Sequence, residues 1–181
     1  MIEIRWHGRG GQGSFTASKL LGIAASVYEG KHALAFPAFG PERRGAPVQA
    51  FTKIDDRKIT DRSEIRSCDY IVLLDETLME ENILKDVKAT GKIIVNSSHP
   101  EKYKRWESYP IIPFDGTAIA MEILKRPITN TAMLGALLGI SGMISLDSAV
   151  HGLQDLLEKS ILSKNIEVLK RSYQKCKEAS Q

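Results

Sequence analysis

Apolar and polar positions in the first part of this chain follow a strand-like period and then a helix-like one. Ile2, Ile4 and Trp6 occupy alternate positions, and this spacing predicts a short β-strand over residues 1–6. In residues 14–28 the apolar side chains recur at helical spacing. The chain therefore begins with a strand, a tight turn and a helix.

Continuous apolar runs further along the chain predict strands buried on both faces of a sheet. They span residues 69–74 and 92–96, and a further strand is predicted over residues 109–114. Further strands are predicted at 33–36 and 48–54, with 58–60 pairing back on the latter, and helices at 76–87, 116–125, 130–143, 145–159 and 165–179. Because strands that alternate with helices favour right-handed βαβ crossovers, we predict an α/β fold with a mostly parallel sheet flanked by helices. We expect one Rossmann-like domain over residues 1–181, with a helical C-terminal third.

Composition excludes several classes of protein. Hydrophobic residues make up 43% of the 181 residues and charged residues 26%, as in an ordinary soluble domain with a full core. A net charge of +3 is too small to indicate nucleic-acid binding, and no apolar run reaches the ~18–20 residues of a membrane span. The chain starts directly with a strand and no signal peptide, so we expect a cytoplasmic protein. Cys68 and Cys176 form no C-x-x-C motif and cannot supply the four ligands of an iron–sulfur cluster.

The turn between the first strand and the first helix has the pattern G-x-G-x-x-G at Gly8, Gly10 and Gly13. Such a turn places backbone N–H groups and a helix N-terminus in front of an anion. A dinucleotide fold usually has an acidic residue about 20 residues further on, but residues 32–37 contain none. We therefore expect a site for a phosphate or polar ligand, not for NAD. The alternative is a tight turn that serves only helix–strand packing.

Two other segments are candidates for binding. Residues 37–47 hold Arg43 and Arg44 in a loop rich in proline and glycine, and the arginine fork suits phosphate or carboxylate oxygens. The alternative is a solvated loop in which Glu42 pairs with one arginine. Asn130 and Thr131 begin a predicted helix, where capping is the simpler role and anion binding the other.

The sequence offers no catalytic set. His7 ends a strand, where a histidine usually satisfies local hydrogen bonds, and the four histidines match no metal spacing. Asp75 and Asp115 lie at strand boundaries, where α/β folds form ligand crevices, but we expect them to cap helices or turns. There is no nucleophile elbow, Walker A lysine or C-x-x-C motif. The residues thus indicate a binding domain, with no catalytic or metal-binding residues of its own.

Three motifs in this order resemble the gamma subunit of 2-oxoacid:ferredoxin oxidoreductases, most closely the pyruvate and 2-oxoisovalerate enzymes. The motifs are WHGRGGQG at residues 6–13, FPAFGPERRGAP at 36–47 and NTAMLG at 130–135, and the resemblance extends over nearly the whole chain. It implies oxidative decarboxylation of a 2-oxoacid with coenzyme A to an acyl-CoA, CO₂ and reduced ferredoxin.

The resemblance also implies a division of labour among subunits. Thiamine diphosphate and the iron–sulfur clusters are expected on partners, namely thiamine-binding and 2-oxoacid-binding subunits and a ferredoxin-like subunit, and no cofactor is expected to bind tightly to this chain. The gamma domain is associated with coenzyme A, whose phosphates suit the glycine turn and the arginine loop. The candidate ligand-binding residues are Gly8, Arg9, Gly10, Gly11, Gln12, Gly13, Glu42, Arg43, Arg44, Gly45, Asn130 and Thr131.

Two other functions stay open at this point. One is a stand-alone nucleotide- or flavin-binding oxidoreductase domain, which would bind its cofactor as an isolated chain. The other is a purely structural subunit, in which the glycine turn and the arginine loop serve as docking surfaces.

Overall fold

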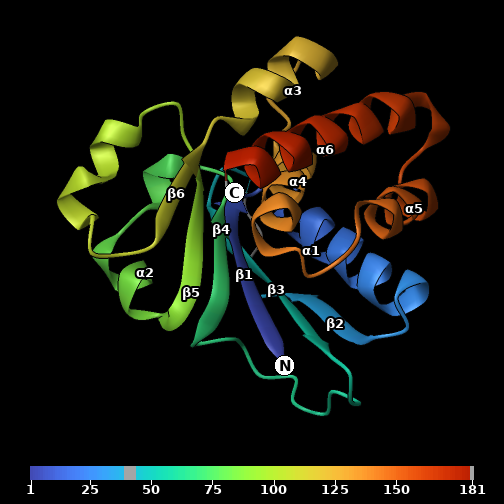
Figure 1. The fold of residues 1–181 in the computed structure, drawn as a ribbon, viewed down its shortest axis with the longest axis horizontal. Helices are drawn as coiled ribbons and strands as arrows, with labels where there is room; N and C mark the ends of the chain where they lie inside the picture. Colours follow the sequence, from blue (N-terminus) through green and yellow to red (C-terminus); the bar gives the residue numbers. More distant parts are fainter. Residues whose placement is uncertain (39–43, 180–181) are drawn as a thin grey trace.

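The structure, a computed structural model, describes residues 1–38 and 44–179 and contains one six-stranded sheet in the order β2-β3-β1-β4-β5-β6 (Figure 1). The strands are β1 (Ile2–Arg9), β2 (His32–Pro37), β3 (Pro47–Asp55), β4 (Cys68–Leu73), β5 (Val87–Asn96) and β6 (Ile111–Phe114). β1, β4, β5 and β6 are mutually parallel, whereas β3 pairs antiparallel with both β1 and β2. Of the described strands, β3 alone runs against the others, so the predicted α/β class and mostly parallel sheet are confirmed.

Helices cover both faces of the sheet (Figure 1). The α-helices are α1 (Ser14–Ile23), α2 (Glu81–Lys85), α3 (Gly116–Leu124), α4 (Asn130–Ser141), α5 (Leu146–Leu156) and α6 (Lys159–Ala179). A π-helical turn, η1 (Ala24–Tyr28), extends α1, and η2 (Glu76–Leu78) and η3 (Pro100–Trp106) are 3₁₀-helices. The predicted helical C-terminal third is therefore confirmed as α4, α5 and α6.

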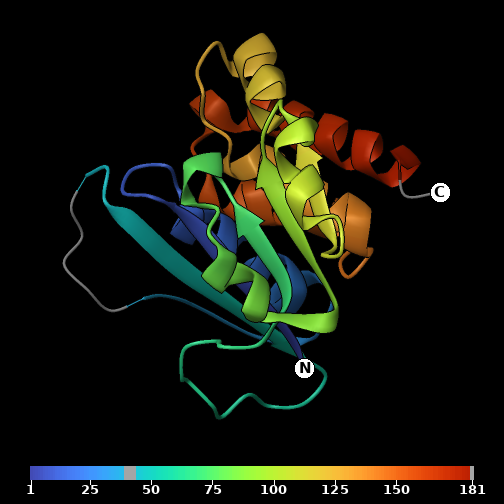
Figure 2. The ribbon, with the colours of Figure 1, turned by 90° about the vertical axis from the view of Figure 1, so that its left-hand side faces the viewer.

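Alternation along the strands sends side chains to two separate cores. Trp6 and Ile94 face the core shared with α1, α4, α5 and α6, whereas Phe51, Ile71 and Ile93 face the core beside α2 and η3. Within the described residues, no helix is both long and apolar enough to cross a membrane. In Figure 2 the N-terminus and the loop of residues 56–67 lie at one end of the sheet, and the glycine turn lies at the other.

Two predicted elements are wrong. Residues 76–87 do not form one helix, because η2 and α2 are separated by extended backbone at Met79 and Glu80, and Val87 already belongs to β5. The local preference for a helix is overridden here, because Glu76 accepts hydrogen bonds from Ser97 and Lys102. These bonds fix Glu76 against the segment that follows β5. Residues 58–60 form no strand, and the loop that contains them is held by an ion pair of 2.6 Å between Asp61 and the buried Lys53.

The order of the strands determines where a ligand crevice forms. From β1 the chain crosses by α1 to β2 on one side, and the later strands β4, β5 and β6 extend the sheet on the other side. In open α/β sheets, ligands bind outside the carboxyl ends of the strands where the order reverses in this way. That point lies between β1 and β4, beside the glycine turn.

Candidate ligand-binding site

The glycine turn joins β1 to α1 in a conformation that requires glycine. Gly11 has φ of 95° and Gly13, the N-cap residue of α1, has φ of 81°, a region where other residues are strained. Gly13 has no side chain with which to cap α1, and the first turn of that helix contains no acidic residue. The N-terminus of α1 therefore keeps the positive end of its dipole and N–H groups that an anion can approach.

The side chain of Gln12 closes this turn from within. Its Oε1 accepts a hydrogen bond from the Arg9 N–H at 2.7 Å, and its Nε2 donates to Asp75 Oδ2 at 3.1 Å. Both ends of the amide are thus used inside the protein. Gln12 therefore shapes the turn, and its predicted contact with a ligand stays a prediction.

Arg9 is held in the same way. Its guanidinium donates to Asp75 Oδ2 at 3.0 Å, to Thr77 Oγ1 at 2.8 Å and to the Gly45 carbonyl at 3.2 Å. Burial opposes the ionisation of Asp75, but hydrogen bonds from Thr77 and Gln12 and the charge of Arg9 keep the pKa of this carboxyl below its usual range. Arg9 therefore ties the glycine turn to the end of β4 and to the arginine loop.

The described part of the arginine loop lies against the glycine turn. Gly10 donates from its N–H to the Ala46 carbonyl at 2.8 Å, and Gly45 donates to the Gly10 carbonyl at 3.1 Å. A parallel bridge between Gly10 and Arg44 completes this contact. Two of the three predicted motifs are thus brought together. Glu42 and Arg43, which we also predicted for the site, lie outside the described residues.

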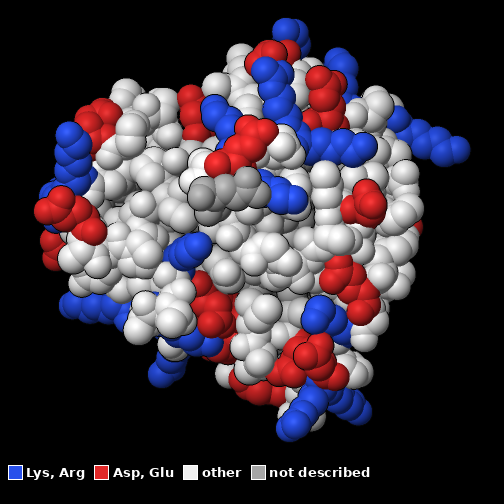
Figure 3. Space-filling model, in the orientation of Figure 1, with Lys and Arg blue, Asp and Glu red and all other residues white. Residues whose placement is uncertain are grey.

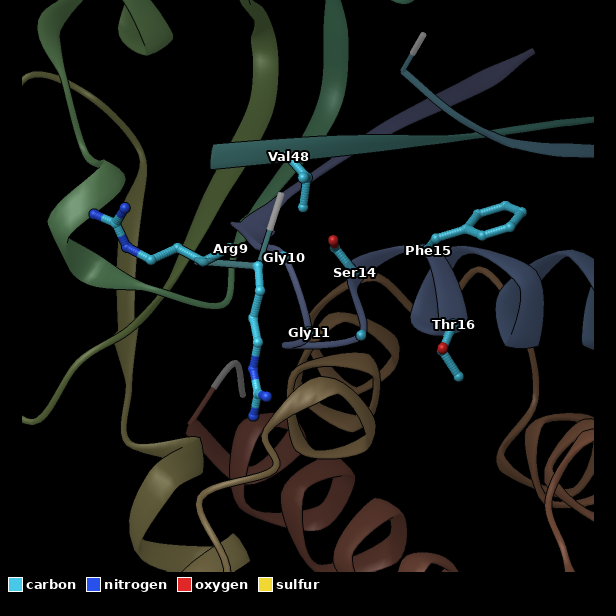
Figure 4. Close-up of a pocket in the computed structure, with 9 residues that line it drawn as sticks. Arg9, Gly10, Gly11, Ser14, Phe15, Thr16 and Val48 are labelled. Carbon is cyan, nitrogen blue, oxygen red and sulfur yellow. The ribbon is translucent and has the colours of Figure 1, made fainter. Parts of the chain in front are cut away.

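A hollow of about 570 Å³ opens between these two segments (Figure 4). Its lining comprises Arg9, Gly10, Gly11, Gly13, Ser14, Phe15, Thr16, Arg44 and Val48. In Figure 4 the Arg9 side chain points away from the Phe15 ring, and Val48 lies between Gly10 and that ring. The hollow combines glycine backbone, the exposed Arg44 side chain and an exposed aromatic ring, which are features that bind a phosphorylated nucleotide.

The third motif reaches the same turn from α4. A β-carbon added at Gly13 would lie only 2.7 Å from Asn130 Nδ2, so the Asn130 side chain packs directly against the turn. We expected this residue to act as a cap, but the N-cap position belongs to Thr129, and Asn130 Oδ1 accepts from the Thr131 N–H at 2.9 Å. Thr131 is fully buried and donates from its hydroxyl to Asn165 Oδ1 at 3.0 Å. Asn130 therefore supports the turn, whereas Thr131 connects α4 to α6.

A second hollow of about 520 Å³ lies on the other side of the turn, outside the carboxyl ends of β4, β5 and β6. Its lining comprises Gln12, Leu74, Asp75, Glu76, Thr77, Asn96, Ser97, Ser98, Asp115, Thr117, Ala118, Pro127 and Thr129. The capping roles predicted for two of its acids are confirmed, since Asp75 accepts from the Thr77 N–H and Asp115 from the Ala118 N–H. Both residues also line this hollow.

Asn96, for which the sequence predicted no role in a site, organises this second hollow. Its Oδ1 accepts from the N–H groups of Gly116 and Thr117 at 3.1 and 3.2 Å, and its Nδ2 donates to the Leu74 carbonyl at 3.0 Å. The signal that could have pointed to Asn96 is a polar residue at the end of a buried strand, because the neighbouring strand β4 is also followed by a polar residue, Asp75. Asn96 thus fixes the start of α3 relative to β4 and β5.

His7 is a structural residue, as predicted. Its Nε2 accepts a hydrogen bond of 2.9 Å from Arg5, which also donates to Asp86 at 2.7 Å. Burial and then the nearby charge of Arg5 lower the pKa of His7 to about 3. The ring is therefore neutral at physiological pH, and it satisfies the buried guanidinium below the turn.

Comparison with known proteins gives one consistent result. Residues 3–175 match the family described as Pyruvate ferredoxin/flavodoxin oxidoreductase. The chain is 44% identical over 174 residues to pyruvate synthase subunit PorC of Methanocaldococcus jannaschii, covering 96% of both chains. It is 41% identical to the pyruvate/ketoisovalerate oxidoreductases common subunit gamma of Pyrococcus furiosus, covering 97% of both. The crystal structure of pyruvate oxidoreductase subunit PORC from Thermotoga maritima superposes with a TM-score of 0.83 at 34% identity, covering 96% of this chain and 95% of that one.

Proposed function

The chain belongs to the pyruvate ferredoxin/flavodoxin oxidoreductase family as a gamma-type subunit, and on that premise we propose that it supplies coenzyme A contacts to an assembled 2-oxoacid:ferredoxin oxidoreductase. The reaction takes a 2-oxoacid, coenzyme A and two oxidised ferredoxins. It yields acyl-CoA, CO₂, two reduced ferredoxins and a proton. Relatives are named for pyruvate and for pyruvate together with ketoisovalerate, so pyruvate is the first substrate to assay and a branched-chain 2-oxoacid the second.

The convergence of three segments on the N-terminus of α1 carries this proposal. The glycine turn and Arg44 come from positions far apart in the sequence, yet they line one hollow, and Asn130 at the start of α4 packs against the same turn. A helix N-terminus beside an arginine fork suits a diphosphate, because both present donors and positive charge. Coenzyme A carries such a diphosphate and a further 3′-phosphate.

Thiamine diphosphate and the iron–sulfur clusters belong, in this proposal, to partner subunits. The two thiols of this chain do not fit a shared cluster, since Cys68 lies in the core beside α2 and Cys176 in the core on the opposite face of the sheet. Burial raises the pKa of each thiol to about 11, which disfavours the thiolate that a metal needs. The partners that we propose are a thiamine-binding, a 2-oxoacid-binding and a ferredoxin-like subunit.

The test measures coenzyme A affinity in the assembled complex with Arg44→Ala in this chain. Arg44 is exposed, so the loss should lie near the lower end of the ~1.5–3 kcal/mol of a charged hydrogen bond, or about tenfold in Kd. Arg62→Ala is the matched control, because Arg62 is also an exposed arginine but belongs to the loop of residues 56–67. Figure 2 shows that this loop lies at the opposite end of the sheet from the glycine turn. Equal affinities for wild type and Arg44→Ala in an intact complex would contradict the proposal.

The two alternative functions give different results. A stand-alone nucleotide or flavin domain would bind its cofactor tightly as an isolated chain and would turn over substrate without partners. A docking subunit would lose its partners on size-exclusion chromatography when Arg44 is replaced, while coenzyme A affinity in the remaining complex stayed the same. We expect neither result.

A further inference from the structure

The two hollows beside the glycine turn differ in the charge of their side chains. Among the described lining residues, the first has Arg9 and Arg44 and no carboxylate, whereas the second has Asp75, Glu76 and Asp115 and no lysine or arginine. Arg9 and Lys102 pair with two of these acids, so the contrast is carried mainly by Arg44 on one side and Asp115 on the other. A polyanionic group is favoured in the first hollow and disfavoured in the second.

Phe15 gives the first hollow a further property. This residue lies in the first turn of α1, and 37% of its surface is exposed, whereas Ser14, Ala17 and Ser18 are buried. Lys19, one turn later, places its ammonium 5.8 Å from the centre of the Phe15 ring. An exposed ring beside a cation, at the edge of an anion-binding turn, offers a surface on which a nucleobase can stack.

We infer that coenzyme A crosses the glycine turn in one direction, with its adenine on Phe15 in the first hollow and its pantetheine arm in the second. This inference rests on the proposed function and adds a direction and a base-binding residue to it. The diphosphate then lies on the N–H groups of the turn beside Arg44, and the 3′-phosphate lies on the side of Lys19, next to the Phe15 ring.

The pantetheine arm is uncharged and carries two amides and a hydroxyl, so the polar, acidic second hollow accepts it without charge repulsion. Thr117, Ser98 and Thr129 provide hydroxyl groups there. The thiol consequently leaves this chain beside the N-terminus of α3 and the carboxyl ends of β5 and β6. That is the edge at which a partner subunit has to receive it.

The test uses the assembled complex and fragments of the ligand. The probes are coenzyme A, adenosine 3′,5′-bisphosphate for the nucleotide end and 4′-phosphopantetheine for the arm. Phe15→Ala removes the stacking surface, and Phe15→Tyr preserves it. Ala118→Phe places a bulky ring at an exposed helical position in the second hollow. Tyr109→Ala is the matched control, because Tyr109 is 38% exposed and precedes β6, at the opposite end of that strand from the hollow.

Loss of one base–aromatic stack should weaken binding by about 5- to 150-fold. We expect Phe15→Ala to weaken coenzyme A and the bisphosphate in that range and to leave 4′-phosphopantetheine unchanged, with Phe15→Tyr close to wild type. Ala118→Phe should weaken coenzyme A and 4′-phosphopantetheine but not the bisphosphate. Tyr109→Ala should change none of the three affinities.

Two results would overturn the inference. An exchanged pattern, in which Phe15→Ala affects the arm and Ala118→Phe affects the nucleotide, would reverse the direction. Unchanged bisphosphate affinity in a folded Phe15→Ala complex would remove the base from Phe15. The proposed function fails separately, when Arg44→Ala also leaves coenzyme A affinity at the wild-type value.

Discussion

Replacing Gly13 with alanine tests how tightly the glycine turn is built against α4. Alanine at φ of 81° costs about 1–2 kcal/mol, because its β-carbon crowds the following carbonyl in the left-handed region. The new β-carbon would also lie 2.7 Å from Asn130 Nδ2 and 3.1 Å from its Cγ, so that side chain has to move. Its movement breaks the 2.9 Å hydrogen bond to the Thr131 N–H, which contributes about 0.5–1.5 kcal/mol. We therefore expect Gly13→Ala to destabilise the fold by about 2–3 kcal/mol.

Gly11→Ala is the matched control for backbone strain alone. Gly11 also has a positive φ, 95°, but a β-carbon there would meet nothing within 4 Å. Its cost should therefore stay at about 1–2 kcal/mol. The difference between the two variants reports the contact with Asn130.

Urea unfolding of both single variants, of Asn130→Ala and of the double variant Gly13→Ala/Asn130→Ala measures each contribution. In the double variant the steric part is absent, so the two substitutions should couple by about 0.5–1.5 kcal/mol. Two results would refute the idea that Asn130 supports the turn. One is that Gly13→Ala destabilises the fold no more than Gly11→Ala does, and the other is that the effects of Gly13→Ala and Asn130→Ala are additive.

Two further predictions concern the fold. His7 has a pKa of about 3 in the folded state and of about 6.5 in the unfolded state, so the unfolded chain binds the proton first as the pH falls. The free energy of unfolding should therefore decrease below pH 6.5, by about 2 kcal/mol at pH 5. Unfolding titrations between pH 7.5 and 5 test this, and a His7→Gln variant should lose this part of the slope; an identical slope would contradict the assignment. Gly139→Ala should push α4 and α6 apart, because the new β-carbon would collide with the Tyr173 carbonyl and lie 3.1 Å from Cys176 Cβ. We expect a loss of at least ~1–3 kcal/mol in thermal or urea unfolding, and an unchanged midpoint would show that the two helices are not so close.

The local parts of the site follow from the sequence. The pattern of residues 1–16 predicted the strand, the turn and the helix, and Gly11 and Gly13 have the positive φ angles that such a turn requires. The arginine loop was predicted as irregular and cationic, and Arg44 lies beside the turn. These features depend on neighbouring residues, whose preferences can be read from one segment.

The remaining parts depend on contacts between distant segments. The sequence does not reveal that the Arg9 guanidinium donates to Asp75 and Thr77, which lie 66 and 68 positions away. Phe15 was counted among the apolar positions of a helix, and helical spacing does not reveal that its ring stays exposed at a hollow. The interruption of the predicted helix over 76–87 likewise follows from the bonds of Glu76 to the segment after β5.

The most direct test of the central claim is the structure of the assembled oxidoreductase with coenzyme A bound, determined by cryo-electron microscopy. The account predicts the diphosphate within hydrogen-bonding distance of the backbone N–H groups between Gly11 and Thr16, beside Arg44. Coenzyme A bound wholly to another subunit, with this glycine turn packed against a partner and closed to the ligand, would contradict it.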